Sequence, residues 1–171
     1  MSKYKFLQDF IESLPKTERL HYSHGVLDYG YILQKGISQF DLTAIQSQYK
    51  LALPKELVEF YTFSYGALLN EIEILTVPQI IHLKEEWQQM RYDEDEDDVE
   101  RLIHLIPFAR LRGVGDVFVF DMAQQKDSYF SILDGFHEYP PSQWESICFG
   151  LENWLTQLVK NDFQQYWLKT D

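Results

Sequence analysis

Apolar residues recur every three to four positions in several stretches of the chain, which is the spacing of one face of a helix. In the first stretch, residues 3–14, Pro15 follows the last apolar position and ends the predicted helix. The same spacing predicts further helices over residues 38–49, 54–65, 76–90 and 151–168.

Two of these helices have a recognisable N-terminus. Ser38 is followed by Asp41, and Thr76 is followed by Gln79, so each cap has a polar partner three residues later. The helix between them has other signals. Leu53-Pro54 opens it, because proline is tolerated in the first turn, and Gly66 is a natural stop, because glycine reaches positive φ.

A second pattern, alternation or an unbroken apolar run, predicts strands. Residues 117–120 are apolar throughout, so we expect them at the centre of a sheet that is covered on at least one face. A long polar loop over residues 120–130 would join them to the next strand. The other predicted strands cover residues 71–75, 103–109 and 129–133, and residues 20–36 predict a loose hairpin or an irregular insertion.

Helices and strands mixed along 171 residues indicate one α+β domain, since domains centre on roughly 100–150 residues. Hydrophobic residues make up 45% of the chain, which is enough to bury a core. The single Cys148 cannot form an internal disulfide and, without a neighbouring base, is predicted to be inert. No signal peptide or membrane span is visible, so we expect a cytoplasmic protein.

The formal net charge is −12. Such a charge disfavours nucleic acid and anionic membranes as direct ligands, because phosphate binding needs clustered Lys and Arg. It suits a cationic protein partner, for which opposite charge speeds encounter. The alternative is that acidity only keeps the protein soluble.

The charge is concentrated in one run, which we predict to be a solvated loop that could face a basic partner. The run lacks the glycine and the spaced ligands of a calcium loop, and no set of His and Cys has zinc spacing. We therefore expect no metal, no cofactor and no catalysis. The candidate partner-binding residues are Asp93, Glu94, Asp95, Glu96, Asp97 and Asp98.

Gly113 and Gly115 could suggest a phosphate-binding loop, but a strand-like run follows them where such a loop needs a helix. A tight turn into a central strand is the structural interpretation. Asp116 and Asp121 could form an acid and base pair, but their spacing on an extended strand predicts opposite faces.

The order of these motifs resembles the SUKH superfamily, which holds fungal glucan-synthesis regulators and bacterial immunity proteins. The resemblance covers roughly residues 37–160, with Gln46 and Ser64-Tyr65-Gly66 departing from the usual residues. It divides the chain into an N-terminal helix with an irregular extension, residues 1–36, and a SUKH-like part, residues 37–171. The fold-signature residues are Leu53, Pro54, Gly66, Pro107, Gly113, Gly115, Asp116 and Asp121.

The resemblance implies helices packed on a central, mostly antiparallel sheet and a non-enzymatic role in binding another protein. An immunity protein would neutralise a cationic toxin domain, for example a nuclease, which must be basic to hold phosphate. A regulatory or scaffolding module with an endogenous partner is the second hypothesis. A carboxylate-based, metal-dependent hydrolase is the third.

Overall fold

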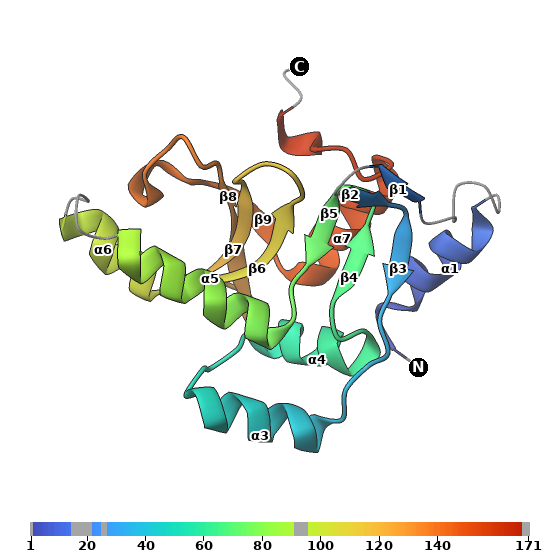
Figure 1. Cartoon of the computed structure of the whole chain (residues 1–171), viewed down its shortest axis with the longest axis horizontal. Helices are drawn as coiled ribbons and strands as arrows, with labels where there is room; N and C mark the ends of the chain where they lie inside the picture. The colour runs from blue at the N-terminus through green and yellow to red at the C-terminus, as the bar shows by residue number, and fades with distance from the viewer. Residues whose placement is uncertain (1, 15–21, 25–26, 91–95, 169–171) are drawn as a thin grey trace.

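A seven-stranded antiparallel sheet forms the centre of the molecule, in the order β3-β4-β5-β6-β7-β8-β9. The structure is a computed structural model that describes residues 2–14, 22–24, 27–90 and 96–168. The strands found there are β1 (Tyr22–His24), β2 (Leu27–Tyr29), β3 (Tyr31–Leu33), β4 (Ala67–Leu69), β5 (Ile72–Ile74), β6 (Leu105–Leu111), β7 (Val117–Lys126), β8 (Tyr129–Gly135) and β9 (Glu145–Phe149). The prediction of an α+β domain with a central antiparallel sheet is confirmed (Figure 1).

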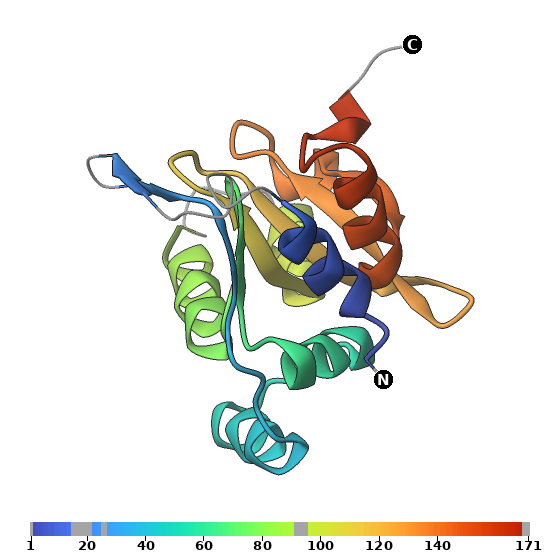
Figure 2. The ribbon, with the colours of Figure 1, turned by 90° about the vertical axis from the view of Figure 1, so that its right-hand side faces the viewer.

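Helices lie on both faces of this sheet. In Figure 1, α5 crosses in front of the sheet, and Figure 2 shows α1 and α7 on the opposite side. Within the described ranges, no helix is both long and apolar enough to cross a membrane. The helices are α1 (Lys5–Ser13), α3 (Gln39–Tyr49), α4 (Lys55–Phe63), α5 (Val77–Met90), α6 (Glu96–Ile103) and α7 (Leu151–Lys160), with 3-10 turns η2 (Pro141–Gln143) and η3 (Tyr166–Leu168).

Strand β7 explains why both faces are covered. Phe118 and Phe120 belong to the main core, where the ring centroid of Phe118 lies 5.0 Å from that of Trp154 on α7. Val117 and Val119 alternate with them and belong to a second, smaller cluster on the α5 and α6 side. The expected buried central strand is confirmed, and its covering is two-sided.

The helix starts predicted from local signals are confirmed. Ser38 Oγ accepts a hydrogen bond from the Asp41 N–H at 3.1 Å at the N-terminus of α3. At the start of α5, Gln79 Oε1 accepts the Thr76 N–H at 2.7 Å. Each contact satisfies a backbone donor that the first turn leaves without a helical partner.

The prediction that Gly66 ends α4 is wrong. The helix ends at Phe63, and the extended Ser64 is its cap. Gly66 instead has φ 95° at the start of the next strand, β4, which is only three residues long and has no polar alternation to reveal it. The positive φ requirement was recognised correctly but belongs to the turn into the sheet.

The prediction of a long loop between β7 and β8 is wrong. Both strands continue through the polar residues and meet at Asp127-Ser128, whose φ angles are 49° and 71°. Positive φ at both central residues is the conformation of a tight type I′ hairpin turn. Figure 2 shows this hairpin extending beyond the body of the domain. Residues 123–129 at its end are exposed to solvent.

The C-terminal helix was predicted to reach Leu168 but ends at Lys160. Asp162 and Phe163 have φ angles of 51° and 58°, so the chain turns, and the Phe163 side chain is 5% exposed. Trp167 then lies across Phe118, with ring centroids 5.3 Å apart. The apolar residues of this segment are therefore buried by a turn and not by one long helical stripe.

The N-terminal residues contribute to the main sheet and core. The predicted helix over residues 3–14 is α1, which places Tyr4 and Leu7 in the main core with no exposed surface. Strands β1 and β2 pair with each other as a separate two-stranded antiparallel ladder, which agrees with one of the two alternatives for residues 20–36, a loose hairpin. Strand β3 pairs with β4, so the sheet begins within the first 36 residues.

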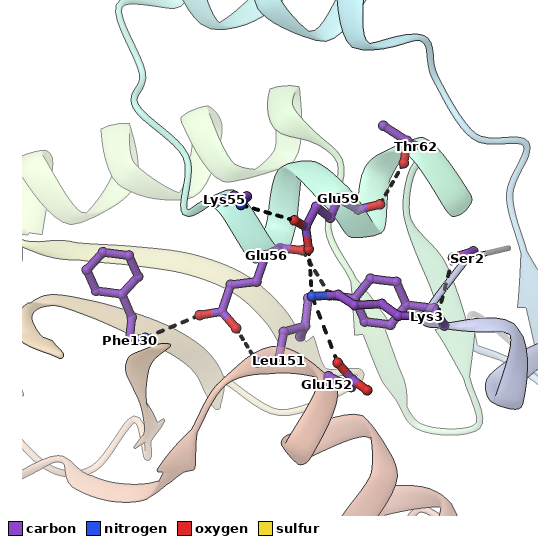
Figure 3. Close-up of polar contacts among 10 residues, drawn as sticks. Ser2, Lys3, Lys55, Glu56, Glu59, Thr62, Phe130, Leu151 and Glu152 are labelled. Atoms are coloured by element: carbon purple, nitrogen blue, oxygen red, sulfur yellow. Dashed lines mark hydrogen bonds and ion pairs between the residues drawn. The ribbon is translucent and has the colours of Figure 1, made fainter. Parts of the chain in front are cut away.

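A buried carboxylate on α4 connects this helix to the start of α7 and to β8. Glu56 lies in the first turn of α4 and is 5% exposed. Its Oε2 accepts the Leu151 N–H at 2.7 Å, and its Oε1 accepts the Phe130 N–H at 3.3 Å (Figure 3). Gly150, the N-cap of α7, has no side chain to offer, so Glu56 caps that helix from another element.

Further polar contacts surround this junction. The Tyr4 hydroxyl donates to the Glu56 backbone carbonyl at 3.0 Å. Lys3 Nζ lies 2.6 Å from a Glu59 carboxylate oxygen and 3.9 Å from one of Glu152 (Figure 3). Burial raises the pKa of the Glu56 carboxyl, and the two N–H donors and Lys3 oppose that increase.

Replacing Glu56 with alanine should destabilise the fold by about 2–3 kcal/mol, because two buried N–H groups lose a charged acceptor. The matched control is Glu59→Ala on the same helix, where loss of a half-exposed ion pair should cost less than about 1 kcal/mol. Urea unfolding followed by tryptophan fluorescence measures both. Equal losses in the two variants would contradict the capping role of Glu56.

The raised pKa of Glu56 also predicts the pH dependence of stability. The folded protein holds the Glu56 proton more tightly than the unfolded chain, so this contribution to stability falls as pH rises above the ordinary value of 4.5. Glu56→Gln does not titrate at this position. The stability of wild type relative to Glu56→Gln should therefore fall as the pH rises from about 4.5 toward neutrality. Unfolding free energies measured across that range test this, and a constant or rising difference would refute it.

Candidate functional site

The acidic run was expected to be a loop throughout, but its second half is helical. Glu96, Asp97 and Asp98 form the first turn of α6, where carboxylates interact favourably with the positive end of the helix dipole. Glu96 and Asp97 are exposed, whereas Asp98 is 6% exposed. Asp93, Glu94 and Asp95 lie outside the described residues. Helix α6 also replaces the start of the strand that was predicted from Ile103.

Asp98 is buried because it holds a neighbouring loop. Its Oδ1 accepts the Ser142 N–H at 2.7 Å. One turn further along α6, Arg101 donates to the Ser142 carbonyl at 2.9 Å and to the Trp144 carbonyl at 3.3 Å. These contacts attach the loop of residues 136–144, between β8 and β9, to α6, and the two segments lie side by side in Figure 1.

A pocket of about 460 Å³ lies between this loop, α5, α6 and the turn from β6 to β7. Trp87 of α5 and Trp144 of the loop lie in its wall, with ring centroids 5.9 Å apart. The Trp144 indole N–H donates to the Tyr139 carbonyl at 2.9 Å and to the Phe136 carbonyl at 3.2 Å, which fixes the loop around the ring. Tyr139 also lines the pocket and is 54% exposed.

The predicted turn at Gly113 and Gly115 contributes to the same pocket. Gly113 has φ 84°, and a Cβ on Gly115 would lie 2.9 Å from the Cβ of His137, so neither position tolerates a larger residue easily. Asp116 follows and is 9% exposed. Its Oδ1 lies 2.6 Å from His137 Nδ1 and accepts the His137 N–H at 3.2 Å, so the turn and the loop are tied together.

The other signature residues have structural positions. Pro107 lies at the register shift between β6 and β7, where a strand tolerates proline. Leu53 is 9% exposed, and Pro54 immediately precedes α4. Asp121 is 3% exposed, accepts the Ala123 N–H at 2.9 Å and lies 4.0 Å from Arg101. Asp121 thus has partners different from those of Asp116.

Residues considered for metal or nucleophilic chemistry give no site in the described ranges. No three His, Cys, Asp or Glu side chains come together there as a metal ion would need. His82 Nε2 lies 3.4 Å from the carboxylate of the exposed Glu86 on its own helix. Burial raises the pKa of the Cys148 thiol to about 11, which agrees with the prediction that it is inert. His21 lies outside the described residues.

A second hollow of about 520 Å³ is lined by residues of β3, β4, β5 and the start of α5. Its wall combines Lys35 and Arg112 with Glu73, and the Glu73 carboxylate lies 2.7 Å from Arg110. Positive and negative groups are therefore mixed here. The aromatic pocket beside α6 has a more definite chemical character and is our candidate functional site.

Sequence reasoning missed the loop of residues 136–144, because it contains no periodic pattern. Strand β9, which follows it, is short and half-buried and was missed for the same reason. The available signal was composition: Tyr139, two prolines and Trp144 lie within six positions. Large aromatic residues in a polar loop need a covering element, and here α5 and α6 supply it.

Replacing Asp98 with alanine should lower the unfolding free energy by about 1–3 kcal/mol, because the Ser142 N–H loses its acceptor. The control is Glu100→Ala, an exposed change on the same helix that should stay within about 0.5 kcal/mol. Amide hydrogen exchange in residues 136–144 should accelerate in Asp98→Ala alone. Unchanged exchange would mean that Asp98 does not hold the loop.

Comparison with protein families gives one result for this chain. The pattern of the SMI1 / KNR4 family (SUKH-1) matches residues 36–166. A comparison with curated proteins gives no match. The matched span includes the signature residues, helix α6 and every residue that lines the aromatic pocket. Because the match covers well over half of the chain, this protein belongs to the SMI1 / KNR4 family (SUKH-1).

Proposed function

We propose that this protein is a non-catalytic immunity-type domain that binds and neutralises a cationic toxin domain in the cytoplasm. Membership of the SUKH-1 family supports a role in binding another protein. The observation that carries the proposal is the position of the acidic N-terminus of α6 beside a loop that it holds through Asp98. Charge and a preformed surface therefore occur on one face.

Electrostatics connects this surface to the class of partner. A nuclease or another toxin that binds phosphate needs a basic surface. A chain with a net charge of −12 repels acidic proteins and attracts such a surface from a distance. Glu96 and Asp97 are exposed, so their charges can attract a basic partner, and the buried Asp98 accepts the Ser142 N–H within the fold.

A regulatory or scaffolding role with an endogenous partner is the alternative. The second hollow, with its mixed charges, favours a partner that is not strongly basic. The partner surface distinguishes the two functions: an immunity protein uses the α6 face, whereas a scaffold of this kind uses the β3 to β5 hollow.

Capture from lysate of the native source tests the proposed function. Purified protein is the bait at low and moderate salt, and captured proteins are identified by mass spectrometry. The proposal expects a basic partner in one-to-one ratio, whose toxic activity stops when the protein is added. A reproducible partner that is neither basic nor toxic would contradict the proposal and support the regulatory role.

Neutralising the acidic run should slow association with that partner. The variant changes Asp93, Glu94, Asp95, Glu96 and Asp97 to Asn or Gln and keeps Asp98, because Asp98 holds the loop. We expect the association rate constant to fall about tenfold at low salt and the difference to shrink as salt rises.

The control carries the same change in net charge at carboxylates elsewhere on the protein: Asp9, Glu12, Glu59, Glu71 and Glu152. Stopped-flow or surface-binding kinetics measures both variants. An equal reduction in the control would show that net charge alone steers association and that the α6 face has no special role.

A further inference from the structure

The aromatic pocket beside α6 combines ring faces with carboxylates. Trp87, Trp144 and Tyr139 supply the aromatic wall. Glu138 lines the same pocket and is exposed, and Asp116 lies behind His137 at 2.6 Å. Aromatic faces and carboxylates are the two groups that attract a cation, since the face of an aromatic ring carries partial negative charge.

Among the residues that the structure describes, no Lys or Arg fills this role. Among the residues that line the pocket in the described structure there is no Lys or Arg. Arg101 is the nearby cation on α6, and its guanidinium donates to the backbone carbonyls of Ser142 and Trp144. The Arg101 guanidinium is therefore bound to the loop backbone and is not one of the groups that line the pocket. The exposed Glu96 and Asp97 at the start of α6 add further negative charge to this side.

We infer that this pocket receives an arginine side chain from the surface of a basic partner protein, stacked on the aromatic wall with its charge facing Glu138. The inference rests on the proposed function and specifies which chemistry of the partner is recognised. Arginine fits better than lysine, because the guanidinium is planar, stacks on rings and is more weakly hydrated than an ammonium. A volume of about 460 Å³ accommodates the side chain together with part of the flanking backbone.

Charge also decides against a second copy of this chain as the occupant. Each copy carries a net charge of −12, so two acidic α6 faces repel each other. An acidic peptide is disfavoured for the same reason. A basic surface is the occupant for which the ring faces, Glu138 and the start of α6 all contribute attraction.

The test uses Nα-acetyl-arginine methylamide as the probe, and the citrulline analogue, which has nearly the same shape without the charge, as its control. Two-dimensional NMR follows the four indole N–H signals of the full chain. The arginine probe should shift the signals of Trp87 and Trp144 in a saturable manner. The signals of Trp154 and Trp167, which pack on Phe118 on the other side of the sheet, should stay unchanged.

Two exposed substitutions test the recognition groups without disturbing the core. Glu138→Gln should weaken binding of the arginine probe about threefold, the effect of one exposed charge pair, and Tyr139→Ala should weaken it by a similar factor. Glu71→Gln, an exposed carboxylate in the turn between β4 and β5, is the control and should change nothing. Equal shifts with arginine and citrulline, or no shift at Trp87 and Trp144, would overturn the inference.

The same variants separate this inference from the proposed function. If wild type, Glu138→Gln and Tyr139→Ala all neutralise a basic toxin and bind it with the same Kd, the function stands and the arginine pocket is refuted. If the arginine probe binds as expected but no toxic partner exists, the pocket stands and the immunity function is refuted.

Discussion

The carboxylate of Glu56, buried between two helices and a strand, is the interaction on which the arrangement of the core depends most. It accepts backbone N–H groups from Leu151 and Phe130, residues far along the chain from α4. Helix α7 has Gly150 at its N-cap, with φ 87°, and a Cβ there would lie 3.0 Å from the Tyr129 ring. A local side-chain cap is thus excluded, and the helix takes its acceptor from another element. One carboxylate thereby sets the position of α7 relative to both α4 and the sheet.

The two faces of the sheet are packed differently. Helices α1, α4 and α7 cover one face with large aromatic residues, and the result is a continuous core. The other face is covered over β6, β7 and β8 by α5, α6 and a loop, which form a smaller cluster around Trp87 and Trp144. A loop cannot present a regular apolar face as a helix does, so packing on this side is incomplete. The pocket beside α6 lies in that gap.

The acidic segment illustrates how one kind of residue takes two roles. Asp98 is buried and holds Ser142, so its charge is satisfied inside the protein. Glu96 and Asp97, two residues and one residue earlier, are exposed, so their negative charge acts in the solvent around them. The buried Asp98 fixes the loop beside α6, and the exposed Glu96 and Asp97 make the surface there negatively charged. Attraction of a basic partner and the geometry of its docking site therefore come from neighbouring positions on α6.

The sequence by itself determined the elements whose signals are local. The caps at Ser38 and Thr76, the apolar run at residues 117–120 and the turn at Gly113 and Gly115 each involve neighbouring residues, and the structure has them as expected. The motif order was also sufficient to indicate the family, which the match over residues 36–166 confirmed.

Tertiary structure alone decided where contacts join distant residues. The capping of α7 by Glu56, the burial of Asp98 against Ser142, and the turn of the chain at Phe163 toward the core all depend on partners brought together by folding. The short strands β4 and β9 carry too few residues for a periodic signal and exist because a neighbouring strand pairs with them. The aromatic pocket has the same origin. Its residues come from α5, α6, a turn and a loop, and only packing makes them one site.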